Sequence, residues 1–303
     1  MKDAAIETPG DSSSLAPART GFAADLAELV KARLTLLVLL TTAVGFYLAA
    51  ESPINYVALF HAVFGTAAAA AGAAALNQWW ERKLDALMHR TRTRPIPGGR
   101  MRPVEALALG AIFSLFGVGY LAVACNTLSS ILAAITIAIY IFGYTPLKRT
   151  STANTLVGAI PGAIPPMIGW AAARGTIDPG AWSLFAVLAL WQLPHFFAIA
   201  WMYRDDYSRA GFRMISNDDQ TGESSASQSV FFCILLLIVA GLPASLQVVT
   251  MFYIPVELIL GGLFIAVAMR FLRLRTVASA RALFFASIIY LPLLLAALVL
   301  TKS

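Results

Sequence analysis

Apolar residues occur along this chain in long runs, which are separated by short or polar segments. Each run is close to the roughly 20 residues that an α-helix needs to cross the hydrocarbon core of a bilayer. Backbone groups in lipid must be hydrogen-bonded within the protein, so the pattern predicts a helical bundle. The fold expected is all-α, with nine transmembrane helices around a central cavity that opens near the cytoplasmic face. The runs lie at about residues 34–50, 56–78, 104–124, 127–147, 154–173, 181–202, 228–248, 255–271 and 281–300.

The polar segments orient this bundle. Charged residues make up 13% of the 303 residues, about half of their share in soluble domains. Of the 22 lysines and arginines, 20 lie on the N-terminal flank or in the connections after even-numbered helices, and Arg174 and Lys302 lie on the other side. The positive-inside rule then places the N-terminus and the long loops 79–103 and 203–227 in the cytoplasm. We expect a multi-pass protein of a bacterial inner membrane, with a disordered tail (1–27) and one membrane domain (28–303).

A polar stripe ends the second apolar run. Asn77, Glu81 and Asp85 are spaced four residues apart, so that they share one face of a helix at separations of roughly 6 Å. Arginines follow closely, among them Arg90 and Arg94. Two carboxylates and an amide beside several arginines suit a divalent cation and a diphosphate. The alternative is that the acids only hydrate a helix end.

A second acidic pair, Asp205 and Asp206, follows the sixth run. If the second and sixth helices face each other, the two acidic sites meet. Magnesium takes oxygen ligands, commonly one or two carboxylates with substrate phosphates and water, and we expect Asn77, Glu81, Asp85 and Asp206 to provide them. Arginine and lysine side chains would hold the diphosphate, although basic residues on this side also orient the protein and contact anionic lipid. The candidates are Arg33, Arg90, Arg94 and Lys148.

Two features lie deeper in the bilayer. His195 follows Pro194 inside the sixth helix, and an ionisable group at that depth suggests a function, for which an axial ligand of haem iron is one candidate. A hydrogen bond to a neighbouring helix is the alternative. The fifth run is interrupted by prolines and glycines between 158 and 169. These residues fit either the wall of an internal cavity or close helix packing.

The motifs resemble those of a known family. The pattern Asn77-x3-Glu81-x3-Asp85, followed by Arg90-Thr91-x2-Arg94-Pro95, is similar to the first motif of the intramembrane prenyltransferases. Further stretches resemble its haem-farnesylating branch. These are residues 31–35, 144–155, 162–170, 191–197 and 204–214. The sequence departs from the family pattern at Arg209, where the wider family has a second acid four residues after the first, and at Ala32, where a proline is common.

This resemblance implies an activity. The enzyme would use Mg²⁺ to transfer a farnesyl group from farnesyl diphosphate to a vinyl group of haem b, giving haem O for terminal oxidases. Asn77, Glu81 and Asp85 would form the first catalytic site, and Asp205 and Asp206 the second. Other partners implied are the lipid bilayer and a downstream haem-modifying enzyme, with no nucleic acid. A related prenyltransferase that acts on an aromatic or quinone precursor would share every metal-site residue, and a secondary transporter could have a similarly broken helix.

Overall fold

The computed structural model describes residues 21–303, so most of the predicted N-terminal tail lies outside the described residues. The first helix among the described residues is α1 (Phe22–Leu29). Nine spans within the described part are long and apolar enough to cross a membrane, which confirms the nine predicted helices. They are α2 (Ala32–Ala49), α3 (Tyr56–Asp85), α4 (Pro103–Ala124), α5 with η1 and α6 (Thr127–Leu147), α7 with α8 (Asn154–Arg174), α9 (Pro179–Met202), α12 with α13 (Glu223–Ser245), α14 (Tyr253–Leu274) and α15 (Val277–Leu300).

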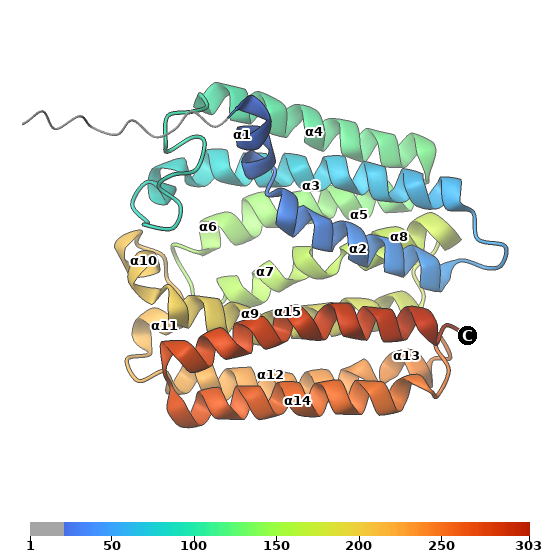
Figure 1. Ribbon diagram of the computed structural model, residues 1–303. Helices are drawn as coiled ribbons and strands as arrows, with labels where there is room; N and C mark the ends of the chain where they lie inside the picture. The colour runs from blue at the N-terminus through green and yellow to red at the C-terminus, as the bar shows by residue number, and fades with distance from the viewer. Residues whose placement is uncertain (1–20) are drawn as a thin grey trace, which may run out of the picture.

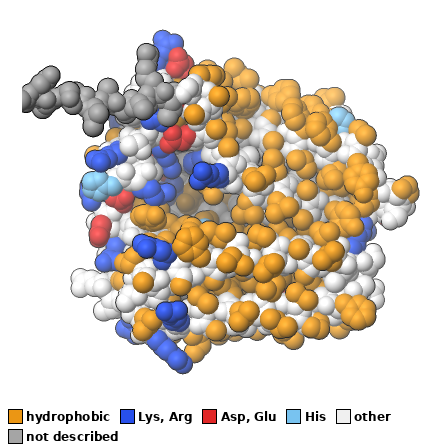
Figure 2. Space-filling view, in the orientation of Figure 1, with side chains coloured by type: hydrophobic (Ala, Val, Ile, Leu, Met, Phe, Trp, Pro, Cys, Tyr) orange, Lys and Arg blue, Asp and Glu red, His pale blue; other side chains and the backbone are white. Residues whose placement is uncertain are grey.

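The spanning helices lie side by side in one bundle (Figure 1). At one end lie α1, α10 (Arg204–Arg209) and α11 (Ile215–Asp218), and at the other lie α13 and the C-terminus. We call the first the motif end, because it carries the loops 86–102 and 203–222. Charged side chains gather at the motif end, and apolar side chains cover the flank of the bundle (Figure 2). The surface therefore has the polarity expected for a chain that spans a bilayer.

The fifth span is broken, as its composition predicted. It consists of α7 (Asn154–Ala163) and α8 (Pro165–Arg174), which meet at Ile164. The glycines here serve close packing: a side chain at Gly169 would overlap the backbone of α2 at Thr42, and one at Gly45 would overlap Pro166. Small residues let helix backbones approach in this way. The structure thus favours the packing alternative for these glycines.

Near the motif end, the second span is longer than its apolar run and the fourth span is not a regular α-helix throughout. Helix α3 continues to Asp85, well past the end of its apolar run, so the whole first motif is helical. The fourth span changes from α5 (Thr127–Ala138) to a π-helical segment, η1 (Ile139–Tyr144), before the short α6 (Thr145–Leu147). π-helical segments are rare overall, and those that occur are often found at functional sites. This one presents Tyr140 and Tyr144, whose rings stack with centroids 5.6 Å apart.

Candidate active site

The first motif forms one buried stripe on α3, as its spacing predicted. Asn77, Glu81 and Asp85 are 1%, 4% and 0% exposed, whereas Trp80 on another face of the same helix is 42% exposed. Two carboxylates are therefore buried at the end of a spanning helix. Charged groups are almost never buried in this way without a partner, so the basic residues around them determine what the stripe can do.

Each member of the stripe contacts one basic side chain from a different segment. Lys31, directly before α2, donates from Nζ to Asn77 Oδ1 at 2.8 Å. Lys148, directly after α6, pairs with Glu81 Oε1 at 2.7 Å. Arg94, in the loop after α3, pairs with Asp85 Oδ2 at 2.7 Å.

Three parts of the chain thus meet at one cluster: the residue before α2, the end of α3 with the loop that follows it, and the residue after α6. We call Lys31, Asn77, Glu81, Asp85, Arg94 and Lys148 the motif cluster. The three contacts among its members join side chains to side chains, and so they can rearrange without movement of the backbone.

One oxygen of the motif cluster has no partner among the described residues. Asp85 Oδ1 is buried and accepts no hydrogen bond. A buried, unsatisfied charged acceptor costs several kcal/mol unless a cation or donor reaches it. The carboxylates of Glu81 and Asp85, with the amide oxygen of Asn77, are hard oxygen donors of the kind that Mg²⁺ prefers.

The donor set therefore fits magnesium. Within residues 21–303 no group of three or more His, Cys, Asp or Glu side chains could hold a metal ion. Two carboxylates are nevertheless a usual protein contribution to magnesium bound with phosphate.

Aromatic side chains enclose the two lysines of the motif cluster. Lys31 Nζ also donates to the Tyr140 hydroxyl at 3.2 Å, and Lys148 Nζ lies 4.4 Å from the centroid of the Tyr144 ring. Burial and the charge of Arg94 lower the pKa of Lys31 to about 7. Burial alone would lower the pKa of Lys148, but Glu81 outweighs it and raises that pKa above its ordinary value.

Asp206 lies against the loop that follows the first motif, and its oxygens bind the backbone of that loop. Its carboxylate accepts hydrogen bonds from the backbone amides of His89 and Arg90, both at 3.2 Å, and from Arg209 at 2.7 Å. Burial would raise the pKa of Asp206, yet the two backbone hydrogen bonds and Arg209 hold it below its usual range. Asp206 therefore fixes the position of the loop that carries Arg90 and Arg94.

Arg90 extends from this loop over the rings of Tyr203, directly before α10, and Tyr207 in α10. Its guanidinium lies 5.2 Å from the centroid of the Tyr203 ring and 5.9 Å from that of Tyr207, and it donates to the Tyr207 hydroxyl at 3.4 Å. A guanidinium held over aromatic faces keeps its outer N–H groups available for an oxyanion. Arg90 thus remains a candidate for binding diphosphate.

Two predicted residues lie apart from the motif cluster. The side chain of Asp205 is 86% exposed and lies 3.9 Å from Arg204. Arg33 is exposed, and no hydrogen bond or ion pair with another described residue is found for it. Lys31, two residues earlier, contacts Asn77, although of these two residues only Arg33 was named among the candidates for the diphosphate. A lysine and an arginine two residues apart at the entry of the first helix were the available signal, but the sequence could not indicate which of the two turns inward.

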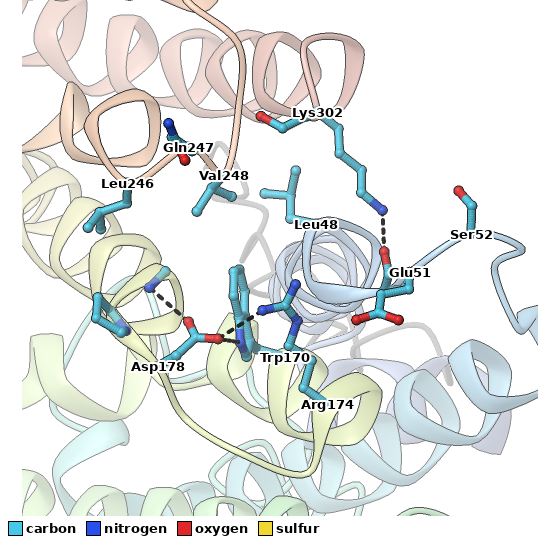
Figure 3. Close-up of a pocket in the computed structure, with 14 residues that line it drawn as sticks. Leu48, Glu51, Ser52, Trp170, Arg174, Asp178, Leu246, Gln247, Val248 and Lys302 are labelled. Atoms are coloured by element: carbon cyan, nitrogen blue, oxygen red, sulfur yellow. Dashed lines mark hydrogen bonds and ion pairs between the residues drawn. The ribbon is translucent and has the colours of Figure 1, made fainter.

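A pocket of about 410 Å³ lies at the opposite end of the bundle, between the end of α2, the start of α9 and the C-terminal segment (Figure 3). Two basic residues line it, and both donate to the last carbonyls of α2. Arg174 donates to Ala49 at 2.8 Å, and Lys302 donates to Tyr47 and Ala50. Cations at the carboxyl end of a helix stabilise it. The central cavity expected at the motif end stays a prediction.

Comparisons with known proteins agree with the sequence motifs. The sequence profile of the UbiA prenyltransferase family matches residues 38–289. The chain is 42% identical over 287 residues to a protoheme IX farnesyltransferase of Solibacter usitatus, covering 92% of this chain and 98% of that protein. It is also 42% identical over 290 residues to a protoheme IX farnesyltransferase of Opitutus terrae, covering 95% and 98% respectively.

Solved structures share the fold. A digeranylgeranylglyceryl phosphate synthase superposes with a TM-score of 0.76 at 16% identity, over 92% of this chain and 98% of that chain. A UbiA homolog from Archaeoglobus fulgidus bound to GPP and Mg²⁺ superposes with a TM-score of 0.62 at 15% identity, over 90% and 99%. With a family profile that matches most of the sequence and relatives aligned over nearly its full length, the chain belongs to the UbiA prenyltransferase family.

Proposed function

We propose that this chain transfers a farnesyl group from farnesyl diphosphate to a vinyl group of protohaem IX, giving haem O and diphosphate. The choice of protohaem IX as the acceptor rests on a sequence identity of about 40%, over more than 90% of the chain, to proteins named protoheme IX farnesyltransferase. The observation that supports the chemistry is the motif cluster, where buried carboxylates and cationic side chains meet at the end of the spanning helices.

The diphosphate of the donor would bind at the motif cluster. Glu81 and Asp85, with Asn77 as a neutral oxygen donor, would hold Mg²⁺, whose charge stabilises the diphosphate leaving group. Lys31, Lys148 and Arg94 already lie on these ligands, and each can turn from its carboxylate or amide to a phosphate oxygen. Arg90 would add a further contact from the loop, and Arg33 could approach from solvent. Because Asp206 binds the loop backbone, we assign it to the placement of Arg90 and Arg94.

The proposed reaction begins with the loss of diphosphate at the motif cluster. The allylic C–O bond of the donor breaks, and its electron pair leaves with the diphosphate. The π electrons of a haem vinyl group form the new C–C bond, and water adds to the resulting cation with loss of a proton, which gives the hydroxyethyl linkage. The apolar helices below the motif cluster would exclude water until the C–C bond has formed. This sequence requires no covalent intermediate on the protein.

Two experiments test this proposal. Mass spectrometry of haems extracted from cells with and without the protein should show haem O only in its presence. Purified protein given farnesyl diphosphate and Mg²⁺ should alkylate haem b and leave 4-hydroxybenzoate unchanged. Prenylation of 4-hydroxybenzoate instead would assign the chain to the branch that acts on aromatic precursors. No product with either acceptor would contradict the proposal.

A further inference from the structure

His195 lies inside the bundle, away from the motif cluster. It is seven residues before the end of α9, so it lies about 10 Å deeper in the bilayer than the motif end. It is half-buried and stacks with the rings of Trp191 and Phe284, whose centroids lie 5.5 Å and 4.9 Å from that of the imidazole at interplanar angles of 25° and 30°. Its Nδ1 lies 2.7 Å from the hydroxyl oxygen of Ser287 on α15.

The hydrogen bonds of Ser287 determine which nitrogen of His195 carries the proton. The Ser287 hydroxyl lies 2.6 Å from the carbonyl oxygen of Phe284 in the same helix. Two oxygens at this distance repel each other unless a proton lies between them, so Ser287 donates its one proton to that carbonyl. Ser287 must then accept from His195, which places the imidazole proton on Nδ1. In the neutral ring, Nε2 is therefore unprotonated and carries a lone pair.

The surroundings leave this lone pair unused. Two aromatic rings stack against the imidazole, the Ser287 hydroxyl takes its Nδ1 edge, and no hydrogen bond to Nε2 is found among the described residues. A neutral imidazole whose Nδ1–H is held by a hydrogen bond, with Nε2 free, has the arrangement of histidines that bind metals in proteins. The aromatic and apolar side chains around it suit the flat, apolar face of a porphyrin.

We propose that His195 binds the iron of the haem substrate through Nε2, and that Ser287 is a positioning residue that keeps this nitrogen unprotonated. The proposal rests on the proposed function for the identity of the substrate. It places the iron deeper in the bilayer than the motif cluster, on the side where the farnesyl chain of a donor bound at that cluster would also extend. His195 would thereby hold the porphyrin in an orientation that presents one edge to the allylic carbon.

A second histidine provides a matched control. His61 on α3 also has Nδ1 at 2.7 Å from a hydroxyl, that of Tyr120 on α4, and it also lies against aromatic rings. It is five residues from the start of α3, at the opposite end of the bundle from the motif cluster. No second acceptor for the Tyr120 hydroxyl is found among the described residues, so the structure does not determine the tautomer of His61.

Spectroscopy of haem b added to the purified full-length protein tests the proposal. Resonance Raman spectra of the ferrous complex should show an iron–histidine stretching band in the wild type and in His61→Ala. The band should be absent in His195→Ala and should return when imidazole is added to His195→Gly. Ser287→Ala retains the backbone carbonyl that accepts from Trp191 and should keep the band, while the Kd for haem rises by about 10-fold.

The outcomes separate this inference from the proposed function. If the band survives in His195→Ala, if it is lost in His61→Ala, or if Ser287→Ala binds haem as tightly as the wild type, the inference is wrong, whether or not the protein forms haem O. If the spectra behave as expected but the wild type forms no haem O from farnesyl diphosphate, the iron ligand stands and the proposed reaction fails.

Discussion

The two acidic motifs look alike in the sequence but differ in what surrounds their carboxylates. Glu81 and Asp85 are paired with flexible lysine and arginine side chains, and Asp85 Oδ1 has no partner among the described residues. Asp206 instead accepts from two backbone amides and from Arg209, and Asp205 faces solvent. Ion pairs between side chains can exchange for a metal and a phosphate, whereas bonds to the backbone break only if the loop moves.

The comparison assigns different roles to similar residues. The first motif has the charge and the free oxygen needed for a metal–diphosphate complex, and the second motif positions the loop that provides two of the arginines. A variant of the first motif should therefore affect the chemical step, and a variant of Asp206 should affect binding of the donor and the stability of the loop.

Asp85→Asn should reduce turnover most, by about 10³-fold, because it removes the charge of a metal ligand and leaves Arg94 without its partner. The measurement is haem O formed per minute by purified protein at saturating farnesyl diphosphate and haem b. Glu105→Gln is the control, since it changes an exposed carboxylate paired with Arg102 at the start of α4. If Asp85→Asn retains more than a tenth of wild-type turnover, its assignment as a metal ligand is contradicted.

Glu81→Gln should reduce turnover by about 10²-fold. The amide oxygen remains a metal ligand, but the charge that pairs with Lys148 is lost. The same assay should show that a higher Mg²⁺ concentration partly restores activity, because the variant has a weaker ligand in the same place. An unchanged dependence on Mg²⁺ would indicate that Glu81 acts on Lys148 alone.

Asp206→Asn should raise the KM for farnesyl diphosphate about 10-fold and lower kcat far less. The amide can accept only one of the two backbone hydrogen bonds well, so the loop of Arg90 should loosen, at a cost to stability of about 1–3 kcal/mol. Steady-state kinetics and thermal unfolding of the purified protein measure both effects. A loss confined to kcat, with normal KM and Tm, would place Asp206 on the metal instead.

Lys31→Ala should raise the KM for farnesyl diphosphate about 10-fold, the loss expected for one charge-assisted hydrogen bond. Arg33→Ala, two residues away and exposed, is the matched control and should change KM by less than about 3-fold, because exposed charges contribute little. The reverse order of the two effects would mean that Arg33, and not Lys31, contacts the diphosphate.

Asp205→Asn should have the smallest effect, within about 0.5 kcal/mol in stability and about 2-fold in activity, as is usual for an exposed side chain. Its value lies in the direct contrast with Asp206→Asn at the neighbouring position, measured in the same kinetic and unfolding experiments. Equal losses in both variants would indicate a shared metal site at the second motif, and would remove the distinction between the two acidic motifs.

Much of the fold follows from local composition. The nine spans, the break in the fifth span and the helical stripe Asn77, Glu81 and Asp85 all depend on residues close together in sequence, so the sequence predicts them well. The π-helical segment at Tyr140 was not predicted, because its apolar composition suits a regular α-helix equally well.

Hydrophobic length and the distribution of charge are properties of the linear chain, so the amino-acid sequence alone predicts the membrane spans and the gathering of acids and arginines at one end. Which side chains meet depends on the tertiary structure. It turned Lys31 to Asn77, used Asp206 to hold the loop at His89, and paired His195 with Ser287. These contacts join residues between 46 and 117 positions apart, and they depend on helix rotation and packing, which no local pattern of residues specifies.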